Sequence, residues 1–366
     1  MPQIYPTPQT KDINILDCGV ENEAYIKNFY QTHRYLPNLT ICINDGVGNF
    51  GALITDSIAD NHLFPQTQCF PLYYYESQFD SLQSSKTPHP KSLPQGEGLS
   101  LDSPSFARGD SESSPSLAEG DKGGGYKPTY RRKDAIRDEA LQAIQGIYKD
   151  SNITKESIFY YIYALLNHNG YKQKYKDNLS KMLPRIPYAK DFWVYEKLGR
   201  ELANLHLQYE SFAKCSRALA IPKDKISLFS GIFGTNSEAK SKDLLSELEP
   251  KDFAIKKMSF EKKGQKDIII FNDKIAIVNI PPKAYNYIVN GKSAIEWIME
   301  RYQVKIDKDS GIKNDPNLYE CKSGALAGLN GGKYALYLLL SIIEMSAQSV
   351  EIIEAISELD FSEVEK

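Results

Sequence analysis

The segment ITKESIFYYIYALLNHNGYKQKYKDNLSKMLPRIPY, residues 153–188, decides the fold. Its first half predicts a helix that begins after Thr154, a typical N-cap residue, with Ile153 placed to pack against Ile158 across the cap. Apolar residues then recur at helical spacing and form one stripe, made of Ile158, Tyr161, Ile162, Leu165 and Leu166. Gly170 is expected to end this helix. The pattern therefore predicts a helix in the core of the protein.

The second half of the segment alternates basic residues with tyrosines. The basic residues are Lys172, Lys174, Lys176, Lys181 and Arg185, and the tyrosines among them are Tyr171, Tyr175 and Tyr188. Cations between exposed aromatic rings suit a phosphate backbone and unstacked bases. A solvated, lysine-rich turn that joins two core helices has the same composition. The segment alone leaves both interpretations open.

Composition restricts where a nucleic acid would bind. The chain has 366 residues, which suits two or three domains, and 41% of them are hydrophobic, enough to form cores. The net charge of −3 excludes a uniformly basic protein, but residues 127–217 hold 17 basic and 10 acidic residues. The C-terminal tail is acidic. Any nucleic-acid-binding face is therefore expected in the middle of the chain, and the 24 tyrosines suggest binding surfaces.

The five cysteines are scattered and form no CxxC pair. This favours a reducing cytoplasm and argues against structural zinc or a disulfide framework, so we expect no metal site. The N-terminus lacks an apolar signal core, and the longest apolar run, residues 334–343, has about half the length of a membrane span. We expect a soluble, cytoplasmic protein without membrane contact.

Three strands are predicted near the N-terminus, over residues 39–43, 51–55 and 69–75. The loop between the first two contains Gly46, Gly48 and Gly51 in the G-x-G-x-x-G spacing of dinucleotide sites. That site needs a helix to start within the glycines, whereas a second strand is expected here, so a glycine-rich hairpin is favoured. Asn44 and Asn49 in this loop either contact base edges or form the turn.

Residues 77–127 consist largely of Ser, Pro, Gly and charged residues and predict a disordered insert without a function of its own. After it, Arg131, Arg132 and Lys133 precede a helix expected over residues 136–147 and are candidates for phosphate contacts. A long amphipathic helix is expected over residues 192–212. His206 is interpreted as an ordinary residue of that helix.

The C-terminal part predicts a β-hairpin, a short helix and a long buried helix. Residues 267–271 and 274–280 flank Asn272-Asp273, a hairpin signal. Asn279-Ile280-Pro281-Pro282 departs from the N-P-P-Y motif of adenine methyltransferases, and Gly291-Lys292-Ser293 lacks the first glycine of a P-loop. Ser293 and Glu296 instead predict a capping box. The last helix, residues 334–356, is apolar on most sides and is expected to be buried.

Several blocks of the chain resemble the C-terminal target-recognition domain of Type ISP restriction–modification enzymes. The most specific are FYYIYALLN (159–167), LPRIP (183–187), GRELANLHLQYE (199–210) and VNGKSAIEWIMERYQV (289–304). The resembling blocks cover most of the chain outside the insert. The resemblance implies a domain that binds duplex DNA, selects a short asymmetric site and positions an adenine for flipping into the active site of a methyltransferase.

The resemblance also implies partners that this sequence does not encode. The family joins a nuclease, an ATP-driven translocase and an N6-adenine methyltransferase to the recognition domain, but their motifs are not found here. S-adenosylmethionine, ATP and Mg²⁺ are therefore implied only for an upstream polypeptide, and no catalytic residue is expected in this chain. The alternative is an inactive or truncated remnant of such an enzyme.

Together these patterns predict an α+β protein: a mixed β-sheet and hairpin recognition module plus a helical bundle, with a long disordered insert. Four parts are expected: a β-rich part (1–76), the insert (77–127), a helical basic segment (128–240) and a hairpin with C-terminal helices (241–366). The predicted DNA-binding residues are Lys172, Lys174, Lys176, Lys181, Arg185, Arg131, Arg132, Lys133, Asn44 and Asn49.

Overall fold

A computed structural model describes most of the chain outside the expected insert. The described ranges are residues 38–44, 50–57, 67–77, 130–212, 217–229, 244–321 and 325–362. The chain divides into two compact units, residues 74–133 and the remainder. In the smaller unit the described part is a pair of strands, β4 (Tyr73–Ser77) and β5 (Tyr130–Asp134), which begins and ends the unit. Most of the expected insert lies outside the described residues.

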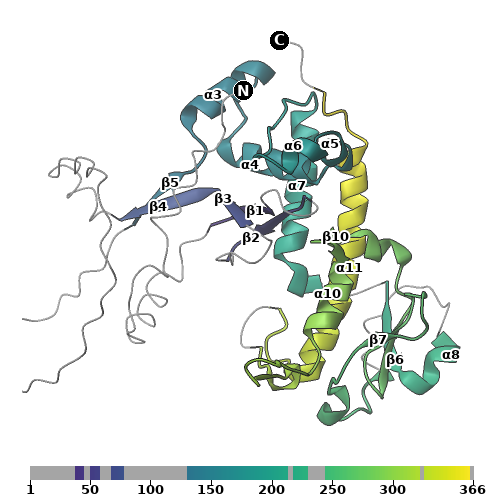
Figure 1. Ribbon diagram of the computed structural model, residues 1–366. Coiled ribbons are helices and arrows are strands. Elements are labelled where there is room, and N and C mark those ends of the chain that lie inside the picture. Colours follow the sequence, from purple (N-terminus) through teal and green to yellow (C-terminus); the bar gives the residue numbers. More distant parts are fainter. Residues whose placement is uncertain are drawn as a thin grey trace, which may run out of the picture. The chain divides into compact units, whose positions relative to one another are not determined.

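The core of the larger unit is built around α4 (Lys155–Asn167), and every residue of α4 from Ser157 onward is buried. The Thr154 hydroxyl caps it by accepting from the Ser157 amide at 3.1 Å, as the sequence predicts. Helix α4 packs against α7 (Phe192–Leu207) and α11 (Gly331–Ser357), and these two also contact each other (Figure 1). The β2 strand closes a further side of α4. A helix enclosed in this way needs apolar residues on all faces.

The first two predicted N-terminal strands are confirmed, whereas the third, predicted over residues 69–75, is divided into β3 (Thr67–Pro71) and β4, which belong to different sheets. β1 (Thr40–Asn44) is central and pairs antiparallel with β2 (Ala52–Thr55) and β3, giving the order β2-β1-β3. Cys42 lies opposite Cys69 in this register, and their sulfur atoms are 3.8 Å apart as free thiols. A strand, β2, follows Gly51, so the helix that a dinucleotide site requires is not formed there.

A second antiparallel sheet has the order β6-β9-β8-β7 and its own small apolar cluster. Its strands are β6 (Leu219–Pro222), β7 (Ser259–Phe260), β8 (Ile269–Ile270) and β9 (Ile275–Val278). The predicted hairpin is confirmed between β8 and β9, where the Asn272 side-chain oxygen accepts from the amides of Lys274 and Ile275. The predicted capping box is also confirmed, since Ser293 and Glu296 cap each other at the start of α10 (Ala294–Arg301).

Helix α11 is buried along most of its length, as predicted. It is long and apolar enough to cross a membrane by length and composition, but 78% of its most apolar window is buried inside the protein, as in a core helix. Its buried Glu344 accepts from the Arg217 guanidinium at 2.9 Å, which compensates the charge. Helix α11 contacts α4 and α7 and also α10, so it packs against both the N-terminal and the C-terminal helices.

The remaining described elements are short. They are α3 (Asp138–Tyr148), α5 (Asn169–Lys174), α6 (Lys176–Leu179), η3 (Tyr209–Phe212), η4 (Lys223–Lys225), α8 (Ile226–Phe229), η5 (Pro250–Phe253), η6 (Pro282–Asn286), β10 (Ile288–Val289), β11 (Lys292–Ser293), β12 (Lys305–Ile306), β13 (Lys313–Asn314) and η7 (Pro316–Leu318). Helices and small antiparallel sheets share one core, which confirms the α+β class.

Two predicted helix ends were wrong. The helix expected over residues 192–212 is α7, which ends at Leu207 and is followed by the separate turn η3. Gly170 does not end the central helix, because it lies within α5. Instead α4 ends at Asn167, and His168 serves both as its C-cap and as the N-cap of α5, where its Nδ1 accepts from the Tyr171 amide at 3.1 Å. The imidazole supplies the acceptor that an Asp or Ser usually provides.

Candidate nucleic-acid interface

The predicted cations of residues 172–185 lie on α5, on α6 and in the loop after α6. Helix α5 is fixed to the end of α11 by two contacts. His168 Nε2 is 3.0 Å from the Leu359 carbonyl, and the Asn169 amide donates to Ser357 Oγ at 3.0 Å. The basic segment is thus attached to the buried core through polar contacts at its start.

The tyrosines of this segment are not exposed, which corrects the expectation of an aromatic binding surface. Tyr171 is 1% exposed and Tyr188 7%, and Tyr175 is half-buried. The Tyr171 hydroxyl donates to the Arg185 carbonyl at 2.7 Å, which holds the loop onto α5. A buried ring with a satisfied hydroxyl belongs to the core and offers no face on which a base stacks.

The structure places Lys172 and Lys174 in different surroundings. Lys172 is half-buried beside a cavity, and burial lowers its pKa to about 8. Lys174 is exposed, with its ammonium 5.4 Å from the Tyr175 ring centre and 5.3 Å from that of Phe361. Side chains two positions apart on a helix are about 200° apart around the helix axis. Lys172 and Lys174 therefore contact different surroundings.

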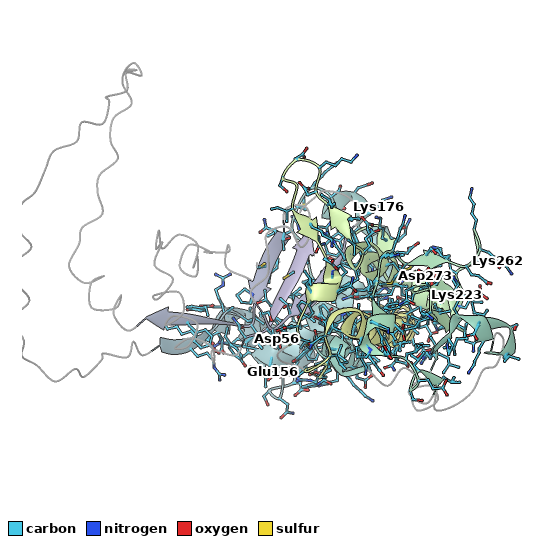
Figure 2. All side chains as sticks on the ribbon, turned by 90° about the horizontal axis from the view of Figure 1, so that it is seen from below. Asp56, Glu156, Lys176, Lys223, Lys262 and Asp273 are labelled. Carbon is cyan, nitrogen blue, oxygen red and sulfur yellow. The ribbon has the colours of Figure 1, made fainter. Side chains whose placement is uncertain are left out.

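Lys176, Lys181 and Arg185 are exposed, as is Lys174. Figure 2 labels Lys176 at the periphery of the larger unit. In the described part of the chain, no carboxylate lies within the 4.0 Å of an ion pair to any of these four. Their positive charges are available to an anionic partner, and their role in DNA binding stays a prediction.

The other predicted site residues are distributed elsewhere. Arg131, Arg132 and Lys133 lie on β5 in the smaller unit, where Arg132 is exposed and Lys133 half-buried. Asn44 is 4% exposed, and its side-chain oxygen accepts from the Gly51 amide at 2.8 Å. This is the turn-forming alternative, because the bond closes the loop between β1 and β2. Asn49 lies outside the described residues.

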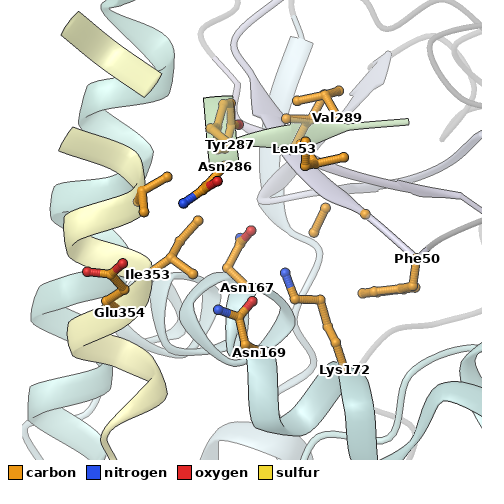
Figure 3. A pocket seen from close by; sticks show the side chains of 14 residues that line it. Phe50, Leu53, Asn167, Asn169, Lys172, Asn286, Tyr287, Val289, Ile353 and Glu354 are labelled. Carbon is orange, nitrogen blue, oxygen red and sulfur yellow. The ribbon is translucent and has the colours of Figure 1, made fainter. Parts of the chain in front are cut away.

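The cavity beside Lys172 has a volume of about 350 Å³ and is built by four distant segments. The β2 segment contributes Phe50 and Leu53, the end of α4 and α5 contribute Asn167 and Lys172, and η6, β10 and α11 form the remaining wall (Figure 3). Sequence reasoning missed this site. Its asparagines carry no motif, and only folding brings Asn286 beside Lys172.

Two segments that partly match functional motifs, at Asn279 and at Gly291, have structural roles. Asn279 takes a left-handed conformation (φ 61°) before Pro281 and Pro282, which lead into η6. Gly291 is in the turn between β10 and β11, where its φ of 81° suits glycine, and Lys292 pairs with Glu300. Among the described residues, no group of three or more His, Cys, Asp and Glu is placed to hold a metal ion.

Comparison with known proteins identifies relatives for nearly the whole chain. The Type ISP C-terminal specificity domain family matches residues 19–327. A solved structure of the ATP-dependent Type ISP restriction–modification enzyme LlaBIII bound to DNA is 31% identical, with a TM-score of 0.61 over 90% of this chain. A nuclease-deletion mutant of the Type ISP enzyme LlaGI in complex with a DNA substrate mimic is 28% identical, with a TM-score of 0.58 over 92% of this chain.

The DrdV–DNA complex, 22% identical with a TM-score of 0.57 over 90% of this chain, shares the fold. This chain spans 16%, 23% and 25% of the LlaBIII, LlaGI and DrdV chains, respectively. No curated protein sequence matched it.

Proposed function

The chain belongs to the family of Type ISP C-terminal specificity domains, and we propose on this basis that it recognises a specific sequence in duplex DNA. Bound there, it would position a target adenine for an upstream N6-adenine methyltransferase and direct the associated nuclease and translocase. The observation that carries the proposal is the family match over residues 19–327, together with a fold shared with two DNA-bound Type ISP enzymes.

The exposed cations support a phosphate-contacting role. Lys174, Lys176, Lys181 and Arg185 present four positive charges over a short stretch of chain, without carboxylate partners among the described residues. Cations that contact phosphates set the register of a protein on DNA, whereas base contacts specify the sequence. We therefore assign these four residues to affinity and leave specificity to other contacts.

A salt titration of duplex binding tests the assignment. Lys174, Lys176 and Lys181 are changed together to Ala, and the dissociation constant is measured by fluorescence anisotropy at several salt concentrations. Because each phosphate contact contributes about 0.9 to the slope of log K against log salt, the slope should flatten by up to about three. Binding should weaken alike for all duplex sequences.

A matched control removes the same charge from lysines that already have partners. Lys251, Lys266 and Lys313 form ion pairs with Glu249, Glu296 and Asp315 at 2.6, 2.8 and 2.8 Å. Changing these three to Ala should leave the salt slope nearly unchanged. An equal loss of slope in both triple variants would contradict a local contact and indicate a non-specific effect of net charge.

The upstream partner is the second part of the proposal. We expect no methylation by this chain alone, and adenine methylation when it is combined with a polypeptide that carries the methyltransferase. S-adenosylmethionine, ATP and Mg²⁺ would be bound by that polypeptide. The alternative, an inactive remnant, predicts no binding to duplex DNA even at low salt. Cytoplasmic localisation stays a prediction.

A further inference from the structure

Lys172 is a cation that its cavity does not neutralise. Helix α11 places Glu354 on the opposite wall, but this carboxylate is already 2.6 Å from Lys283 Nζ. No other carboxylate in the described ranges forms an ion pair with Lys172. A half-buried ammonium without a counter-charge is unfavourable unless a ligand supplies an anionic group.

Three asparagines line the same cavity. Asn167 is buried, and its Nδ2 donates to the Tyr163 carbonyl at 3.0 Å, which fixes the side chain. Asn169 and Asn286 are exposed at the rim. The Lys172 and Asn167 side chains extend into one space (Figure 3). An amide both donates and accepts, which suits the mixed donor and acceptor edge of a nucleobase.

Apart from Glu354, most of the remaining lining is apolar and includes Phe50, Leu53, Val289 and Ile353. These side chains come from opposite sides, so a flat ring between them would lose much of its contact with water. A volume of about 350 Å³ lies within the usual range for small-molecule sites. Inorganic phosphate would engage Lys172 but leave the apolar wall without a partner.

We propose that this cavity binds one nucleotide, with its phosphate at Lys172 and its base between the asparagine amides and the apolar wall of Phe50 and Leu53. Two kinds of ligand offer this phosphate and base: an extrahelical nucleotide of bound DNA, and a free deoxynucleoside monophosphate. The first source rests on the proposed DNA recognition, and the second does not. Lys172 then has a role apart from that of the exposed cations.

The test measures how fast an amine-reactive ester acylates Lys172 in the full chain, with Lys174 as the internal reference, by peptide mass spectrometry. The probes are deoxyadenosine 5′-monophosphate, deoxyadenosine, inorganic phosphate, a perfect duplex and a duplex with one bulged adenine. The monophosphate should slow the labelling of Lys172 at least about fivefold and leave Lys174 unchanged. Deoxyadenosine and phosphate should require at least about tenfold higher concentrations, because each lacks one of the two sets of contacts.

Two rim variants test the base contacts without disturbing the core. Asn169→Ala and Asn286→Ala should each raise the dissociation constant of the monophosphate about fivefold, the loss of one hydrogen bond. Asn204→Ala, an exposed position on α7 away from the cavity, should not change it. Equal affinity in all three variants would overturn the placement of the base.

The duplex arms separate this inference from the proposed function. Protection by the bulged duplex, beyond that by the perfect duplex, would identify DNA as the source. Protection by the free monophosphate alone would keep the site and identify a free nucleotide. Equal protection by both duplexes, with none by the monophosphate, would make Lys172 an ordinary contact to the DNA phosphate backbone. That outcome would leave the proposed DNA recognition intact and contradict the nucleotide site.

Discussion

At the scale of single residues, Lys172 lowers the stability of the fold. Its pKa is about 8 in the folded protein against an ordinary value of 10.5. Below about pH 8 the folded state must keep a charge that burial disfavours, whereas the unfolded state keeps it in water. The difference corresponds to about 3 kcal/mol at about 1.4 kcal/mol per pKa unit, and partial exposure reduces it to about 1–2 kcal/mol.

The first prediction is that Lys172→Met stabilises the protein. At pH 7 the free energy of unfolding in urea should rise by about 1–2 kcal/mol. The gain should shrink as the pH rises from about 8 and vanish above about 10.5, where the lysine is neutral in both states. Lys174→Met, on an exposed side chain, should change stability by less than about 0.5 kcal/mol. Destabilisation by Lys172→Met at pH 7 would contradict the uncompensated charge.

His206 is a second residue with a pH-dependent effect, since burial lowers its pKa to about 3. Ser349 donates to the Met345 sulfur at 3.3 Å, so Ser349 Oγ accepts from His206 Nε2 at 2.9 Å. His206 Nδ1 then accepts from the Tyr163 hydroxyl at 2.6 Å. The neutral imidazole thereby joins α4, α7 and α11, a role that sequence periodicity does not reveal.

The second prediction concerns acid stability. Between about pH 6.5 and 3 the unfolded chain binds a proton at this position and the folded chain does not, so stability falls as the pH falls. Unfolding in urea at about pH 5 should show a loss of about 2 kcal/mol from His206 relative to pH 7. Tyr163 and Tyr287, which face the ring, have raised pKa values because of burial and do not titrate in this range. His206→Gln should remove this part of the pH dependence. An unchanged pH profile of the free energy of unfolding would contradict the assignment of this effect to His206.

At the scale of elements, the α4–α7 contact depends on a glycine. A Cβ atom at Gly199 would lie 2.1 Å from the Tyr160 carbonyl oxygen, so the two helices touch there through backbone. Both atoms belong to rigid helices, and relief requires the helices to separate. The close packing of α4 against α7 therefore excludes any side chain at this position.

The third prediction compares two helical glycines. Gly199→Ala should destabilise the protein by about 2–4 kcal/mol, because overpacking moves a whole interface. Gly146→Ala on α3 meets no atom within 4 Å and should stabilise by about 0.5–1 kcal/mol through helix propensity. Thermal unfolding of both variants measures the difference. Equal effects would mean that α4 and α7 do not approach as closely as described.

Elements were predictable wherever the signal is local. The Thr154 cap, the Ser293–Glu296 capping box and the turn at Asn272 follow from residues within a few positions of each other, and all are confirmed. The role of the tyrosines was not predictable. Their rings suit a surface or a core, and the choice depends on which distant helix covers them. Gly170 was misassigned because His168, two residues earlier, already provides both caps.

At the scale of the whole molecule, the family was recognisable from the sequence and the candidate site was not. The specific blocks run through the chain in order, and the family match covers residues 19–327. The cavity combines Phe50, Lys172 and Val289, which are more than 100 positions apart and share no motif. Such a site is determined by tertiary packing, so one sequence does not predict it.

The central claim is that this chain selects a sequence in duplex DNA, and one measurement tests it most directly. The purified chain is incubated with a pool of random duplexes at physiological salt, and the bound fraction is recovered, amplified and sequenced over several rounds. We expect enrichment of one short asymmetric motif, with binding to that motif at least about 10³-fold tighter than to an unrelated duplex. Recovery of DNA without an enriched motif, or no recovery of DNA, would contradict it.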